Sequence, residues 1–133
     1  MPTATVTLRN IPGTEAALGL AGAHTVVVDR PDGTAGGMGL GFNGAQLLAL
    51  TVGGCFANDL RYMAAKTGAA IADIDISVDV TLEGDPIIAT SAAMTVRVTT
   101  TDGSDPQALI DAAKAISMAM NSLPRGIPVT VTS

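Results

Sequence analysis

Cys55 is the residue of this chain best suited to nucleophilic chemistry, because it is the only cysteine and lies in a run of good helix formers. In a helix, the residues three, four and seven positions further on share its face, and here they are polar: Asn58, Asp59 and Tyr62. The alternative is a buried structural cysteine in a helix that emerges into solvent at these polar residues. A nearby Asp59 carboxylate would disfavour the thiolate and so works against reactivity.

A pair of glycines precedes this cysteine. In the interior of a helix, Gly53 and Gly54 each cost about 1 kcal/mol relative to alanine. Such a cost indicates the close approach of another backbone or of a ligand. We therefore expect a pocket near Gly54, Asn58 and Asp59.

The remaining candidate groups favour no other chemistry. His24 is the single histidine and falls in a strand pattern, where a structural role is favoured. The glycine run at residues 36–41 lacks the Lys-Ser/Thr of a phosphate-binding loop, and Ser117 has no nucleophile-elbow pattern around it. One histidine and one cysteine do not form a tetrahedral zinc site without carboxylates, so we expect neither a metal nor a cofactor.

Composition narrows the class of protein. The 133 residues include seven Lys and Arg against twelve Asp and Glu, a net charge of −5, which argues against a phosphate-binding surface. Aromatic residues make up 2%, too few for a base-stacking platform, so no nucleic-acid partner is expected. Hydrophobic residues at 47% and charged residues at 14% predict a folded core. Residues 1–133 are expected to form a single domain.

The sequence also bears on the compartment. A single cysteine excludes an intrachain disulfide, and the N-terminus lacks the basic and apolar regions of a signal peptide. The longest strongly apolar run, residues 47–57, falls short of the roughly 20 residues that span a bilayer. We expect a cytoplasmic protein with no membrane partner.

Hydrophobic periodicity predicts an α+β domain with antiparallel strands and two helices. The predicted strands are residues 3–10, 24–29, 71–83, 87–101 and 127–132, and the predicted helices are residues 45–66 and 104–121. Gly68 fits a left-handed cap for the first helix, and Ser104 with Gln107 fits a capping box for the second. Pro128 suggests an edge position for the last strand.

Two of these elements carry strong patterns. In residues 71–83, apolar side chains alternate with an acidic face that contains Asp73, Asp75 and Asp79, as in a half-buried sheet. The second helix has a stripe of Leu109, Ala113, Ile116 and Met120. The first half of helix 45–66 is apolar all round and must be buried on nearly every side. A small domain seldom surrounds such a helix, and a partner subunit could supply the missing cover.

Residues 42–60, Phe-Asn-Gly-Ala-Gln-Leu-Leu-Ala-Leu-Thr-Val-Gly-Gly-Cys-Phe-Ala-Asn-Asp-Leu, resemble the cysteine helix of the OsmC/Ohr family. The family comprises osmotically induced protein C and the organic hydroperoxide resistance proteins. The order of the following segments is also similar: Ala-Ala-Lys-Thr-Gly, an Ile/Val/Asp strand, and a second helix that ends in Ser-Met-Ala-Met-Asn-Ser-Leu. The resemblance extends from about residue 26 to residue 131.

The resemblance implies an OsmC-like fold, in which antiparallel sheets wrap around two long central helices in an intertwined homodimer. Enzymes of this family reduce organic hydroperoxides. A peroxidatic thiolate, stabilised by an arginine that a glutamate holds, attacks the O–O bond and becomes a sulfenic acid. A second cysteine then forms a disulfide with it, which an external dithiol reduces.

Position by position, the resemblance assigns the peroxidatic role to Cys55. Ser117 stands where the second cysteine belongs, and a serine cannot resolve a sulfenic acid as a disulfide. Ala45, ten residues before the cysteine, stands where the supporting glutamate belongs. Arg9 is the first candidate for the activating arginine and Arg30 the second.

Three hypotheses follow. In the first, Cys55 belongs to a one-cysteine hydroperoxide reductase that an external thiol resolves. In the second, Ala45 and Ser117 leave a catalytically silent scaffold that binds a small hydrophobic ligand at the dimer interface. In the third, the acidic strand face binds a partner protein, although a solvated sheet face is the favoured interpretation of those carboxylates.

Overall fold

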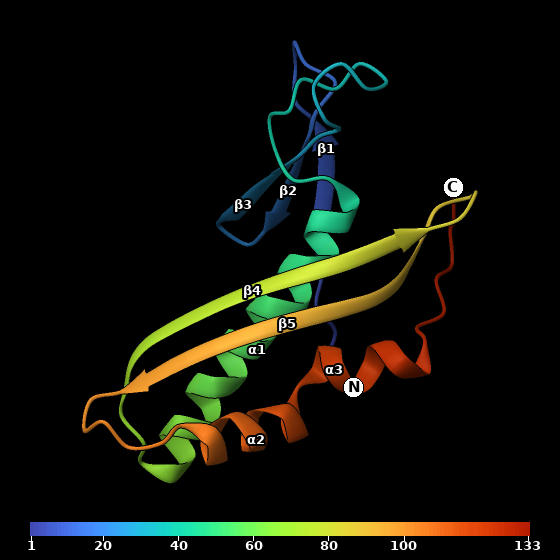
Figure 1. Ribbon diagram of the computed structural model, residues 1–133. Helices are drawn as coiled ribbons and strands as arrows, with labels where there is room; N and C mark the ends of the chain where they lie inside the picture. The colour runs from blue at the N-terminus through green and yellow to red at the C-terminus, as the bar shows by residue number, and fades with distance from the viewer. The chain divides into compact units, whose positions relative to one another are not determined.

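A computed structural model describes all residues, 1–133, and the chain divides into an N-terminal unit, Met1–Leu47, and a C-terminal unit, Leu48–Ser133. The elements follow one another as three strands, a long helix, two strands and two helices (Figure 1). The strands pair antiparallel throughout, so the α+β class predicted from the periodicity is confirmed. None of the helices combines the length and the hydropathy that a membrane crossing requires.

The N-terminal unit contains a three-stranded sheet in the order β1 (Thr7–Asn10), β2 (Ala17–Ala21) and β3 (His24–Val28). The strand β2 was not predicted, because its sequence of alanine, leucine and glycine has little strand propensity. It is a strand because β1 and β3 pair with its two edges. Residues 3–6, predicted as strand, lie outside the sheet, and the pairing with β2 begins at Thr7, opposite Leu20.

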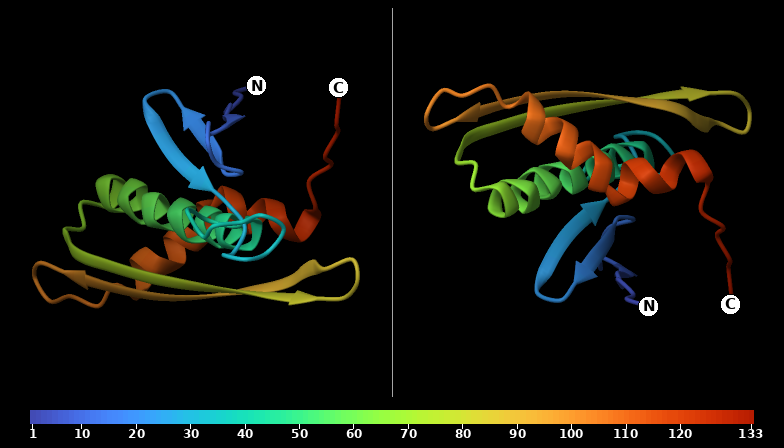
Figure 2. Two further views of the ribbon diagram at one scale, coloured as in Figure 1. Left: turned by 90° about the horizontal axis from the view of Figure 1, so that it is seen from above. Right: turned by 90° about the horizontal axis from the view of Figure 1, so that it is seen from below.

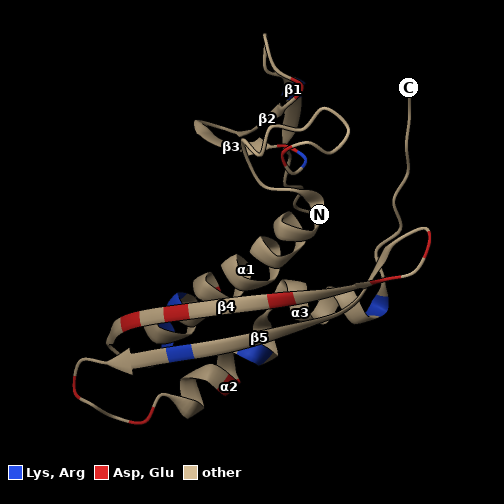
Figure 3. Ribbon diagram, turned by 45° about the horizontal axis from the view of Figure 1, so that its top comes forward, with Lys and Arg blue, Asp and Glu red and all other residues tan.

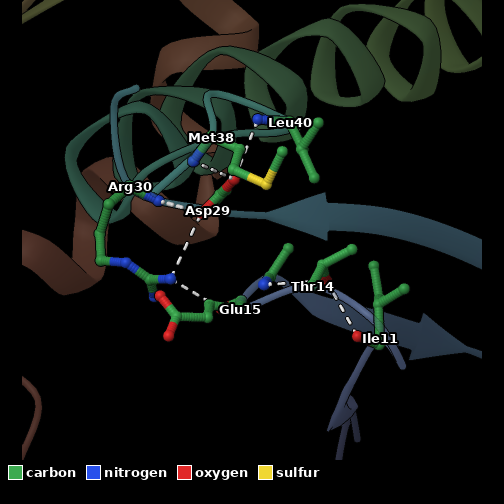
Figure 4. Close-up of polar contacts among 8 residues, drawn as sticks. Ile11, Thr14, Glu15, Asp29, Arg30, Met38 and Leu40 are labelled. Carbon is green, nitrogen blue, oxygen red and sulfur yellow. Dashed lines mark hydrogen bonds and ion pairs between the residues drawn. The ribbon is translucent and has the colours of Figure 1, made fainter. Parts of the chain in front are cut away.

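The loop that follows β3 is organised by Asp29, whose side chain is buried (Figure 4). Its carboxylate accepts hydrogen bonds from the backbone N–H groups of Arg30, Met38 and Leu40 at 2.8, 3.1 and 3.0 Å. These bonds, led by that from Leu40, hold the pKa of Asp29 below its ordinary value of 3.8. Arg30 also donates from Nη2 to the carbonyl oxygen of Glu15 at 2.7 Å.

The glycine run of this loop serves backbone packing. A Cβ at Gly41 would overlap the backbone of Val27, and one at Gly37 would lie 2.6 Å from the carbonyl oxygens of Arg30 and Pro31. Only glycine allows the loop to lie this close to β3.

The helix α1 (Gly44–Thr67) follows, and both of its ends have clear causes. At its start, Asn43 and Gln46 form a reciprocal capping box, with backbone-to-side-chain hydrogen bonds of 2.9 and 3.0 Å. At its end, Gly68 has a φ of 80°, the predicted left-handed cap.

In the C-terminal unit, β4 (Ile71–Glu83) and β5 (Ile88–Thr100) form a long antiparallel hairpin. Helices α1 and α2 (Gln107–Ile116) pack against the same face of this hairpin (Figure 2). The buried core between them consists of Phe56, Leu60, Ala64, Val98, Leu109 and Ala113. The alternating pattern of β4 is confirmed at Ile74 and Ile76, which pack against this core, whereas Leu82 near the end of the strand is 42% exposed. The acidic residues of the other face, which are coloured red in Figure 3, are exposed.

The second predicted helix is in fact two. Helix α2 ends at Ile116, Ser117 is extended with φ −62° and ψ 116°, and α3 (Met118–Ser122) begins beyond it. The predicted capping box was wrong, because Pro106 is the N-cap residue, Ser104 Oγ lies 3.1 Å from Thr100 Oγ, and Asp105 accepts from Gln107 N–H. The apolar stripe in the sequence continues across this position, so it could not reveal the break. Because of the break, Ile116 is 46% exposed although it belongs to the stripe.

The chain ends in a short 3₁₀ helix, η1 (Leu123–Arg125), and an irregular segment. Residues 127–132 were predicted as a strand, and they form none, because no strand edge pairs with them. Their apolar side chains are exposed: Ile127, Val129 and Val131.

Some large side chains of α1 are also exposed to solvent in a single chain. Leu50 is 48% exposed, and the lone tyrosine, Tyr62, is exposed as well. The glycine pair was predicted to mark the close approach of another backbone or of a ligand. At Gly53 the close neighbour is instead a side chain of the same chain, since a Cβ there would lie 3.0 Å from Val78 Cγ2. A Cβ at Gly54 would meet nothing within 4 Å.

Candidate functional site

Cys55 lies in the middle of α1 with its thiol half-buried. Its Sγ donates a hydrogen bond to Oδ2 of Asp59, at 3.6 Å. The two side chains meet because residues four apart in a helix are neighbours on one face, as the spacing predicts. The thiol and the carboxylate are therefore positioned by a single helix.

Ser117 approaches the same thiol from the break between α2 and α3. Its side chain is fully buried, and its Oγ donates to Cys55 Sγ at 3.9 Å. The same oxygen accepts from the backbone N–H of Met120 at 3.4 Å, the N-cap interaction of α3. The extended backbone of Ser117 thus caps a helix and also places a hydroxyl against the thiol.

Asp59 is the least expected member of this cluster. It is only 6% exposed, whereas its helical neighbours Asn58 and Tyr62 are exposed. The thiol of Cys55 is the only side-chain hydrogen-bond donor to it. The one salt bridge of the molecule lies elsewhere, between Arg30 and Asp29. The alternative in which α1 emerges into solvent at these polar positions is therefore wrong for Asp59.

The other residues singled out in the sequence are not in this cluster. Arg9 lies on β1, exposed and opposite Leu18, and Ala45 is half-buried in the first turn of α1. Both belong to the N-terminal unit. Arg30, the second candidate arginine, is engaged with Asp29 and the backbone of Glu15. His24 is exposed on β3, and no three His, Cys, Asp or Glu residues gather as a metal would need.

A groove of about 430 Å³ lies within the C-terminal unit. It is mostly apolar, and its walls come from α1, β5 and the α3–η1 region: Leu48, Val52, Ala89, Thr90, Ser91, Ala92, Met120, Leu123 and Pro124. Val52 lies one helical turn before Cys55, and Met120 lies three residues after Ser117. Two of its lining residues are thus close neighbours of the thiol–hydroxyl pair.

The three residues expected to line a pocket, Gly54, Asn58 and Asp59, are not among those that line this groove. Sequence reasoning missed its lining because most of it comes from segments far from Cys55 in the chain. The spacing of Val52, three residues before Cys55, was the one local signal. The rest depends on how β5 and α3 pack, which periodicity does not determine.

The arrangement combines a nucleophile, a hydrogen-bond donor and a proton acceptor. A thiol can attack an electrophilic atom, the Ser117 hydroxyl can donate to the sulfur before and after attack, and the Asp59 carboxylate can accept the thiol proton. No second thiol is present to form a disulfide with Cys55.

Known proteins share this fold. Residues 36–132 match the family model described as OsmC-like protein. An OsmC-like protein from Mycoplasma pneumoniae superposes with a TM-score of 0.75 at 16% identity, over 92% of this chain and 88% of that one. The organic hydroperoxide resistance protein OhrB of Bacillus subtilis superposes with a TM-score of 0.57 at 26% identity, over 90% and 88%. The chain matches none of the curated proteins.

Proposed function

Because this chain belongs to the OsmC-like protein family, we propose that it is an organic hydroperoxide reductase that uses Cys55 alone and an external thiol. The observation that carries the proposal is the hydrogen bond between Ser117 Oγ and Cys55 Sγ, at 3.9 Å. The resemblance places the second cysteine at Ser117, and this position lies directly against the thiol. The name of the Bacillus subtilis relative supports the substrate class.

The reaction divides into an oxidation and a reduction. The Cys55 sulfur attacks the hydroperoxide oxygen, the O–O bond breaks, and the products are a cysteine sulfenic acid and an alcohol. A serine hydroxyl cannot displace water from the sulfenic acid to form a disulfide. An external thiol does so instead, releasing water and forming a mixed disulfide, and a second external thiol then restores Cys55.

The groove beside the site supports an organic rather than an inorganic peroxide. Its walls are mainly apolar side chains, among them Leu48, Val52 and Leu123. Apolar walls favour an alkyl or aryl group through the hydrophobic effect, and they gain nothing from hydrogen peroxide. We expect the organic part of the substrate to occupy this groove.

We further propose that the working form is a homodimer. In a single chain Leu50 and the apolar side chains of residues 127–131 are exposed, and Gly54 has open space above it. A second copy that packs along α1 and pairs with the C-terminal segment would bury these groups. A natively folded monomer in a sedimentation experiment at micromolar concentration would contradict this.

The reductase proposal is tested by the rate at which Cys55 becomes a sulfenic acid. Reduced protein is mixed with cumene hydroperoxide or with hydrogen peroxide, dimedone traps the product, and intact mass reports it, with Cys55→Ser as the control. We expect trapping at least tenfold faster with the organic peroxide than with hydrogen peroxide, and faster than for free cysteine. Rates equal to those of free cysteine would refute the proposal.

The same groove supports a second candidate function. If the thiol is silent, a pocket of about 430 Å³ with apolar walls is still of a size that binds small molecules. In this alternative the protein binds a small hydrophobic ligand without chemistry, in this groove of a single chain rather than at the dimer interface expected from the sequence. Saturable stabilisation by hydrophobic compounds in a thermal-shift screen, together with an unreactive Cys55, would favour it.

A further inference from the structure

The oxidation and reduction steps of the proposed function leave the part played by the buried Asp59 carboxylate unassigned. We propose that Asp59 is the catalytic base of Cys55, taking its proton before attack and returning it to the alcohol that leaves. This inference rests on the proposed hydroperoxide reductase function, which it extends by one residue.

The geometry supports a direct transfer. The Cys55 thiol donates to Asp59 Oδ2, with 3.6 Å between the sulfur and the oxygen, so no third group is needed between the two atoms. Both side chains project from one face of α1, which fixes their separation without help from a loop. Ser117 donates to the sulfur from another element, so the negative charge left on Sγ has a hydrogen-bond donor.

Burial supports the same role. A charged carboxylate held away from water costs free energy unless it is paired or hydrogen-bonded. Asp59 is only 6% exposed and forms no salt bridge. The Cys55 thiol is the only side chain that donates a hydrogen bond to it. A structural aspartate would be expected to have more partners, as Asp29 has with three backbone donors.

With Asp59 as the base, the protons and electrons of the oxidation step balance without any further group. Asp59 takes the thiol proton, and the thiolate attacks the outer oxygen of the organic hydroperoxide. The O–O bond breaks, the sulfur is oxidised to the sulfenic acid, and the peroxide is reduced. The alkoxide that leaves takes its proton from Asp59, which returns to the carboxylate with no net change. An external thiol later reduces the sulfenic acid.

A competing role for Asp59 predicts the opposite result. If the carboxylate acts only through its charge, it repels the thiolate and suppresses reactivity. Removing the charge then raises the rates at which Cys55 is alkylated and oxidised. If the carboxylate is the base, removing it leaves the thiol without an acceptor and slows Cys55. The direction of the change distinguishes the two roles, and a merely structural role predicts neither.

The experiment compares Asp59→Asn with Asp79→Asn, the same chemical change at an exposed position of β4. Two rates are measured at pH 7 in the full-length protein: alkylation of Cys55 by iodoacetamide and its oxidation by cumene hydroperoxide. We expect Asp59→Asn to slow both rates at least tenfold and Asp79→Asn to leave both within twofold of the unmodified protein.

An unchanged or faster alkylation rate in Asp59→Asn would overturn the inference. Alkylation needs no peroxide, so the base is tested even if the protein does not reduce hydroperoxides, and the two failures are distinguishable. Should Asp59→Asn fail to fold, Asp59→Glu and Asp59→Gln make the same comparison. The glutamate variant should then react at least tenfold faster than the glutamine variant, and equal rates would overturn the inference.

Discussion

At the scale of the residue, the position beside the thiol differs from the family pattern by a single atom, in addition to Ala45 in place of the supporting glutamate. Ser117 presents an oxygen where the resemblance expects a sulfur, and that oxygen lies 3.9 Å from Cys55 Sγ. The buried hydroxyl also caps α3, so the position has a structural use that does not depend on redox chemistry. A serine at this position therefore excludes an internal disulfide with Cys55 and caps α3.

We expect Ser117→Cys to restore an internal disulfide with Cys55, because the two side-chain atoms are already in contact. After one equivalent of cumene hydroperoxide, intact mass should show loss of two hydrogens, and dimedone trapping should fall at least tenfold. The Ser117→Ala variant is the control and should show no such mass loss. Undiminished dimedone trapping in Ser117→Cys would contradict the prediction.

At the scale of the element, the loop before α1 depends on one carboxylate. The segment between β3 and α1 contains no helix or strand, and the Asp29 carboxylate holds it by accepting three backbone hydrogen bonds. The two more distant donors, Met38 and Leu40, lie nine and eleven residues further along the chain. Asp29 therefore closes the glycine-rich loop onto the end of β3.

We predict that Asp29→Asn destabilises this loop at neutral pH, because an amide presents N–H groups to donors that need an acceptor. Amide exchange at Met38 and Leu40 should accelerate at least tenfold. The melting temperature at pH 7 should fall by several degrees. Exchange at both amides equal to that of the unmodified protein would show that the carboxylate does not hold the loop.

The pH dependence of this effect has a definite sign. The pKa of Asp29 in the folded protein lies below its ordinary value of 3.8, so the charged form stabilises the fold. This stabilisation is complete at pH values above 3.8, the ordinary pKa, and it is lost as the pH falls through the lowered pKa of the folded protein. The difference in melting temperature between the unmodified protein and Asp29→Asn should therefore be constant near neutral pH and narrow below 3.8.

The elements also show where sequence patterns suffice. Residues 71–83 were predicted with the bounds that β4 has, because alternation over thirteen residues is unambiguous. The strand β2 and the break at Ser117 were missed, since each depends on contacts with distant segments. In the site, helical spacing predicted that Asp59 lies beside Cys55. Only the family resemblance placed Ser117 there, 62 residues further along the chain.

At the scale of the whole molecule, the apolar groups that a single chain leaves exposed are the basis of the homodimer that we propose. Some helix glycines have nothing within 4 Å of the place where a Cβ would lie. Replacing such a glycine with alanine should stabilise the folded chain by about 1 kcal/mol. Gly54 is such a position. Its retention in a strong helix is explained if the partner backbone approaches it in the homodimer that we propose.

We therefore predict that Gly54→Ala weakens the dimer, raising its dissociation constant at least tenfold in analytical ultracentrifugation. The matched variant is Gly53→Ala, where the new methyl group would meet Val78 within the same chain. It should change the melting temperature and leave the dissociation constant within twofold. A Gly54→Ala protein that melts higher, with unchanged association, would place the partner elsewhere.

The chain has one tyrosine and no tryptophan, so its near-ultraviolet emission comes almost wholly from Tyr62. That ring is 65% exposed, and it lies seven residues, about two helical turns, after Cys55. A single fluorophore on this helix gives the protein an intrinsic optical signal. Changes in its intensity and anisotropy on dilution would report the proposed association along α1 without any added label.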